Sequence, residues 1–159
     1  GARVAILDLG RSKGAEVAKS IGDAAIFCEA DVANEEQVTA ALDEAVGRFG
    51  GIHAAVNCAG IGTAGRTVDK SGKPFDLKLF ELTLRVNLVG SMQLTHEVLP
   101  IMKERRQGSI VMINSMIIRD VLPNMGPYGA SKAALMAATQ GLAREIGVHG
   151  IRVNSALPG

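Results

Sequence analysis

The feature that most constrains the fold of this chain is a regular alternation of short apolar segments with amphipathic ones. Strand-like apolar segments occupy residues 3–7, 24–29, 52–56, 109–114 and 151–156, and helix-like segments separate them. Such alternation places helices over parallel strands. The order βαβαβαβαβ therefore predicts an α/β fold, with a doubly wound parallel sheet that carries helices on both faces.

The helix-like segments show their own start and stop signals. Asn34 can cap one helix, with Gln37 in a capping-box-like spacing, and paired glycines after residue 49 end it. Pro100 is expected to kink or interrupt the longest helix near its end. The predicted helices cover residues 12–21, 34–49, 76–105 and 128–146.

Composition favours a soluble, cytoplasmic globular chain. It is 47% hydrophobic and 21% charged with a net charge of +1, and no apolar stretch is long enough to span a bilayer. The basic cluster 103–106 is interpreted as a solvated helix end, so no nucleic-acid partner is expected. Cys28 and Cys58 are expected to be buried free thiols, and the three histidines form no metal-ligand pattern.

A candidate catalytic group centres on the only tyrosine, Tyr128. Lys132 follows at i+4 and therefore shares its helix face, about 6 Å along the axis. A free tyrosine ionises near pH ~10 and is a poor acid or base at neutral pH unless a nearby cation favours phenolate. Lys132 is predicted to be that cation. Ser115 ends a strand-like segment, where a hydroxyl could orient a substrate carbonyl or alcohol.

With these residues in place, the chain resembles the short-chain dehydrogenases/reductases over essentially its whole length. The matching residues are Ser115, the Tyr128-x-x-x-Lys132 helix, the Asn57-Cys58-Ala59-Gly60 turn and the Pro158-Gly159 turn. The resemblance implies a catalytic set of Asn87, Ser115, Tyr128 and Lys132, in which Asn87 holds a water of a proton relay through Lys132. Cys58 departs from the family pattern, which has asparagine at that position.

The resemblance also implies a nicotinamide cofactor. Asp8, at the end of a strand, can accept hydrogen bonds from ribose hydroxyls and would repel a 2′-phosphate, which favours NAD over NADP. Arg11 and Lys13 are the competing signal, since they could neutralise that phosphate. The expected cofactor-binding residues are Asp8, Leu9, Asp31, Val32, Asn57, Ala59, Gly60, Tyr128, Lys132, Pro158 and Gly159.

One expected element is missing from the sequence given. The family's first strand and its glycine-rich turn should precede the strand at residues 3–7. In the strand order 3-2-1-4-5-6 this strand lies in the middle, so a gap in the sheet is predicted. We therefore expect residues 1–159 to form a single dinucleotide-binding domain that is incomplete at both ends.

The expected function is NAD-dependent interconversion of a secondary alcohol and a ketone, without a metal. The turn at 56–61 and the polar insertion at 70–74 look similar to the 3-hydroxyacyl-CoA and 17β-hydroxysteroid branch, and the apolar residues after Ser115 fit either a bulky apolar substrate or simple loop packing. A non-catalytic fragment or scaffold on the same fold is one alternative, and epimerisation or dehydration with the same cofactor is another. The resemblance implies a homodimer or homotetramer.

Overall fold

The computed structural model describes residues 1–159 and contains five strands in two parallel sheets. β1 (Val4–Asp8) pairs with β2 (Ala25–Glu29), while β4 (Gly108–Ile113) lies between β3 (Ala54–Asn57) and β5 (Ile151–Ala156). The predicted α/β class is confirmed. Each predicted strand is present, with ends that differ by no more than two residues.

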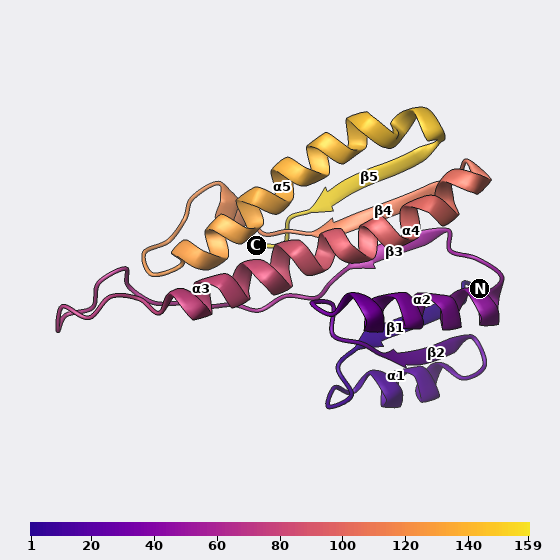
Figure 1. The fold of residues 1–159 in the computed structure, drawn as a ribbon, viewed down its shortest axis with the longest axis horizontal. Helices are drawn as coiled ribbons and strands as arrows, with labels where there is room; N and C mark the ends of the chain where they lie inside the picture. The colour runs from indigo at the N-terminus through magenta and orange to yellow at the C-terminus, as the bar shows by residue number, and fades with distance from the viewer.

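Helices follow each strand except the last. They are α1 (Gly14–Ile21), α2 (Glu35–Phe49), α3 (Leu77–Leu84), α4 (Ser91–Arg105) and α5 (Gly126–Ile146). Figure 1 shows β1 and β2 with α1 and α2 as one group, set apart from β3, β4 and β5 with α4 and α5. No helix is long and apolar enough to pass through a membrane.

The start of α2 forms as its sequence predicts. The Asn34 side chain accepts a hydrogen bond from the Gln37 amide at 3.1 Å. The reciprocal bond goes elsewhere, because the Gln37 side chain accepts from the backbone N–H of Asp31 at 2.8 Å. α2 ends at Gly50, whose φ of 79° lies in the left-handed region that favours glycine. The cap therefore also fixes the turn that carries Asp31.

The long helix predicted over residues 76–105 is continuous but not uniform. Its middle turn, η1 (Arg85–Gly90), is π-helical, and it separates α3 from α4. Pro100 was predicted to kink or interrupt this helix, and the interruption is wrong, since α4 runs through Pro100 to Arg105. Pro100 and His96 are both exposed, so the helix bond that proline cannot make is lost on the solvent side. The departure from α-helical geometry lies instead at η1, where π turns often accompany functional sites.

The hydrophobic core joins the two groups of elements. Its main cluster combines residues of α2, α4, α5 and the three-stranded sheet, among them Val38, Val98, Met102, Ile110 and Leu135. A smaller cluster lies between β2 and α2 and consists of Cys28, Ala30 and Ala41. Partly buried Leu7 of β1 packs against both clusters.

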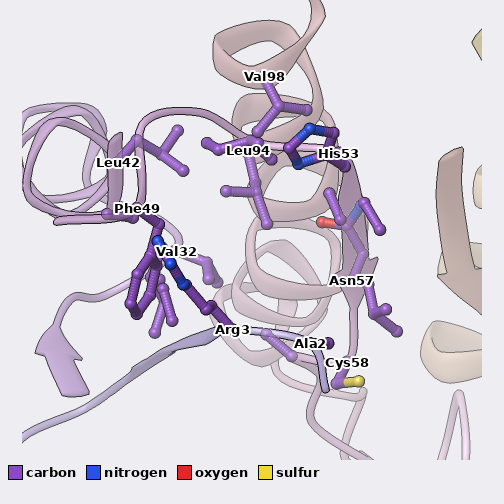
Figure 2. Close-up of a pocket in the computed structure, with 18 of the residues that line it drawn as sticks. Ala2, Arg3, Val32, Leu42, Phe49, His53, Asn57, Cys58, Leu94 and Val98 are labelled. Carbon is purple, nitrogen blue, oxygen red and sulfur yellow. The ribbon is translucent and has the colours of Figure 1, made fainter. Parts of the chain in front are cut away.

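The predicted gap in the sheet is present between β1 and β3. No ladder joins these strands, and a cavity of about 580 Å³ lies there. Figure 2 shows Leu42 and Phe49 on one side of it, Leu94 and Val98 on the helix behind it, and Cys58 at its edge. The cavity is lined mainly by apolar side chains. This slot, the space between β1 and β3, is the one departure from a continuous parallel sheet.

Only one of the two cysteines is buried. Cys28 is only 2% exposed and belongs to the smaller cluster between β2 and α2. Cys58 is a free thiol that is exposed, so the expectation that both thiols are buried is wrong for it. Its position explains the difference, because Cys58 follows β3 at the rim of the slot and no neighbouring strand covers it.

Candidate active site

α5 places Tyr128 and Lys132 on one face of its first turns. The helix begins at Gly126, and Pro127 supplies the fixed φ that suits its first position. The Lys132 Nζ lies 5.8 Å from the centroid of the Tyr128 ring. At this distance the ammonium acts on the ring and on any negative charge that forms on its oxygen.

Lys132 is held in an unusual setting for a lysine, because its side chain is only 5% exposed. Its Nζ donates to the backbone carbonyl of Ile113, the last residue of β4, at 2.7 Å. Burial lowers the pKa of this ammonium below its ordinary value. The bond to Ile113 anchors the cation two residues before Ser115.

Ser115 lies two residues beyond the carboxyl end of β4 in extended backbone. Its Oγ accepts from the Ile117 amide at 3.2 Å and caps the short 3₁₀ turn Met116–Ile118. A hydroxyl that accepts in this way still has its own proton to donate. The Met116 amide donates to the Pro158 carbonyl at 3.1 Å. The predicted turn at Pro158 and Gly159 therefore lies beside the serine.

Asn87 lies in the π turn η1 with its side chain fully buried. Its Oδ1 accepts from the Ile61 amide at 2.7 Å, and its Nδ2 donates to the Ile61 carbonyl at 3.0 Å and to Ser131 Oγ at 2.9 Å. Both amide hydrogens are thus used within the protein. The Asn87 side chain connects the turn after β3 with α5.

The predicted dinucleotide residues divide between the two sheets. Asp8 ends β1 and Leu9 follows it, and the exposed Asp8 carboxylate has one bond, accepted from the Leu9 amide at 2.8 Å. Asp31 and Val32 follow β2, where the Asp31 side chain accepts from the Ala33 amide at 2.9 Å. All four residues lie near the carboxyl ends of parallel strands, where open α/β sheets bind ligands.

The turn after β3 approaches Lys132 closely because position 60 is glycine. A Cβ built on Gly60 would lie 3.3 Å from Asn87 Oδ1 and 3.8 Å from Lys132 Nζ. The backbone of Ala59 and Gly60 is thus open to close approach, which a dinucleotide requires of such turns. Asn57 differs, since its side chain turns inward and its Nδ2 donates to Thr95 Oγ1 at 3.2 Å. With the exposed carboxylate of Asp8, these features fit a dinucleotide at the strand ends.

Sequence reasoning missed two participants, Ser131 and the backbone of Ile61. Ser131 was one of several small residues around Tyr128, and nothing near it in the sequence marks its contact with Asn87, 44 positions away. Ile61 contributes only backbone groups, which leave no signature in the sequence. Tertiary structure alone identifies both.

Comparison with known proteins agrees with this geometry. The family described as short chain dehydrogenase matches residues 1–159. The chain is 35% identical to the 3-hydroxyacyl-CoA dehydrogenase type-2 of Drosophila melanogaster, over all of this chain and 65% of that protein. It therefore spans somewhat less than two thirds of this relative's length.

Two solved structures have the same fold over the whole chain. One is an NAD⁺-bound xylitol dehydrogenase, with a TM-score of 0.92 and 31% identity over 61% of its length. The other is a gluconate 5-dehydrogenase from Burkholderia cenocepacia in complex with NADP and tartrate, with a TM-score of 0.90 and 33% identity over 62% of its length. From the match along every residue and from these relatives, the chain belongs to the short-chain dehydrogenase family.

Proposed function

We propose that this chain carries the active site of an oxidoreductase that interconverts a secondary alcohol and a ketone with NAD. The observation that supports it most is the buried Lys132 ammonium above the Tyr128 ring, held by the carbonyl that ends β4. A fully structural lysine would rarely be this buried without an acidic partner. A site that must stabilise a transient phenolate has a use for such a cation.

The proposed proton path begins at Tyr128. In alcohol oxidation its oxygen, stabilised as phenolate by Lys132, removes the hydroxyl proton of the substrate, and in ketone reduction it returns that proton. Ser115 donates its hydroxyl proton to the substrate oxygen and holds it near Tyr128. When bound, the nicotinamide cofactor supplies the carbon that accepts or gives the hydride. Lys132 would also hold the nicotinamide ribose.

We infer that the Asn87 side chain has a positioning role beside the relay role that the family resemblance implies. Its side chain uses both amide hydrogens on Ile61 and Ser131. Its backbone carbonyl accepts from Ser91 Oγ at 3.0 Å. A water held by Asn87 would therefore have to share that carbonyl or the remaining lone pair of Oδ1. We infer that the side chain chiefly positions the turn at Ile61.

NAD is proposed as the cofactor because of the carboxylates at the end of the first sheet. Asp8 and Glu29 are register partners at the ends of β1 and β2, and both are exposed. A 2′-phosphate near Asp8 would meet negative charge, while ribose hydroxyls would meet hydrogen-bond acceptors. Arg11 and Lys13 follow in the same loop and are the groups that would favour NADP.

The substrate is proposed to carry an apolar portion. Met116, Val121 and Leu122 follow Ser115 and have side chains that are 40%, 49% and 57% exposed. Val121 packs against Gly129, the residue after Tyr128, so the apolar surface continues to the reacting groups. The acyl chain of a 3-hydroxyacyl-CoA or the ring system of a hydroxysteroid would suit this surface. A homodimer or homotetramer stays a prediction.

The test is cofactor reduction, followed by nicotinamide absorbance, with 3-hydroxyacyl-CoA, hydroxysteroid and polyol substrates, each with NAD and with NADP. Tyr128→Phe is the matched control, which keeps the ring and should lower turnover by about 10²- to 10⁴-fold. Full activity in that variant would falsify the proposed role of Tyr128. Absence of turnover with every pair would favour the non-catalytic alternative, and product analysis would reveal epimerisation or dehydration.

A further inference from the structure

Ser131 lies between Tyr128 and Lys132 on α5 and is fully buried. Its hydroxyl donates to the Tyr128 carbonyl at 2.7 Å and accepts from Asn87 Nδ2 at 2.9 Å. Because a hydroxyl has a single hydrogen, the bond to Tyr128 leaves only its lone pairs facing Asn87. Ser131 thus presents an acceptor to the amide of Asn87.

This acceptor determines which way the Asn87 amide faces. In the observed orientation, Oδ1 accepts from Ile61 N–H and Nδ2 donates to Ile61 C=O and to Ser131. A flipped amide would oppose its oxygen to the Ile61 carbonyl and to the serine lone pairs, and its NH₂ to the Ile61 N–H. All three bonds would be lost between side chains that are fully buried. Without the Ser131 hydroxyl, one amide hydrogen of Asn87 has no acceptor.

The Asn87 amide in turn holds the turn after β3 over Lys132. Ile61 receives both of its bonds, and Gly60 precedes it directly, close to Lys132 Nζ. This turn therefore lies beside the ammonium that donates to the Ile113 carbonyl. Movement of the turn would admit water to Lys132 and displace the backbone that is expected to meet the cofactor.

We propose that Ser131 is a positioning residue of this active site: through Asn87 it sets the position of the Gly60–Ile61 turn relative to Tyr128 and Lys132. The proposal rests on the proposed function for its kinetic consequences. Its structural content, a link from the helix of Tyr128 to the Ile61 amide, can be measured without turnover.

The test compares Ser131→Ala with Thr139→Val in the purified enzyme. Thr139 is a matched control, because it is also buried on α5 and its hydroxyl also donates to a helix carbonyl, that of Leu135 at 2.7 Å, but it does not contact Asn87. Hydrogen exchange at the Ile61 amide should become about 10-fold faster in Ser131→Ala and stay unchanged in Thr139→Val. Equal exchange in both variants would overturn the proposal.

The kinetic measurements separate positioning from general destabilisation. Ser131→Ala should lower kcat by about 10-fold or more, since small displacements of reacting groups are costly. The alkaline limb of the pH profile of kcat should move to higher pH in this variant, because water admitted to Lys132 favours its charged form. Ser131→Thr, which keeps the hydroxyl, should recover both.

The outcomes distinguish the two proposals. A wild-type enzyme without turnover on any substrate would end the proposed function, while faster Ile61 exchange in Ser131→Ala would still support the link. An active Ser131→Ala enzyme with unchanged kcat and pH profile would show that Ser131 is only structural, and the proposed function would stand.

Discussion

The charge of Lys132 offers the most direct quantitative test of the site. Lys132→Met keeps a side chain of similar length and removes the ammonium. With Nζ 5.8 Å from the Tyr128 ring centroid, the attraction for a phenolate is about 3 kcal/mol at an effective dielectric constant of about 20. That energy corresponds to about 100-fold in rate. In a water-like dielectric the same distance gives less than about 1 kcal/mol, or about 3-fold.

The assay is kcat at saturating cofactor, near neutral pH, with the best substrate from the panel. Saturation is needed because Lys132 is also proposed to hold the nicotinamide ribose, and its loss would weaken cofactor binding. Lys103→Met is the control, since Lys103 is an exposed lysine in the last turn of α4 and should change kcat less than about 2-fold. A loss of only about 3-fold in Lys132→Met would refute electrostatic stabilisation of phenolate at this site.

Lys132→Met also tests how the free energy of unfolding depends on pH. Burial lowers the pKa of Lys132 in the folded chain, so between that lowered value and its ordinary value the unfolded chain binds more protons. Stability contributed by this residue should therefore rise with pH through that alkaline window, and the cost of burying the ammonium is fully present below it. Urea unfolding should show the wild type gaining on Lys132→Met as pH rises. A difference that is constant or falls with pH would contradict this sign.

Two further predictions concern parts of the chain away from the reacting groups. A thiol reagent near neutral pH should modify only Cys58 in the native chain, because Cys28 is buried and burial raises the pKa of its thiol to about 11. Cys58→Ser should abolish labelling, and rapid reaction of Cys28 would contradict this prediction. In urea unfolding, Gly150→Ala should lower the free energy of unfolding by about 2 kcal/mol or more, because its φ is 75° and a Cβ would press on the Arg106 carbonyl. Gly147→Ala is the control and should change this free energy little, because Gly147 has a φ of −55° and open space around it.

Local signals in the sequence were sufficient for the main elements and for part of the site. The cap at Asn34 and the strand before Ser115 depend on neighbours a few residues away, and each formed where its pattern placed it. The i+4 spacing likewise brought Lys132 over Tyr128. Helical geometry alone determines that relation, so no tertiary information was needed.

Other features depend on contacts between distant segments and could not be predicted. The π turn around Asn87 has no composition signal, and the inward side chain of Asn57 depends on Thr95 of α4. Pro100 was expected to kink or interrupt its helix because proline usually does so, and its exposed position, which lets α4 continue, depends on the tertiary packing. Cys58 was expected to be buried because an apolar strand end is usually covered on both sides, and here the slot adjoins it.

The divided sheet has a consequence for how the molecule unfolds. No backbone ladder crosses from β1 to β3, so side-chain packing around α2 and Leu7 joins the two groups of strands. Side-chain packing alone connects two groups of strands less strongly than a shared sheet does. The group of β1 and β2 should therefore unfold at a lower denaturant concentration than the group that carries Tyr128. An extended segment that hydrogen-bonds to both β1 and β3 would couple the two unfolding transitions into one. Cooperativity of unfolding would then report directly whether that space is filled.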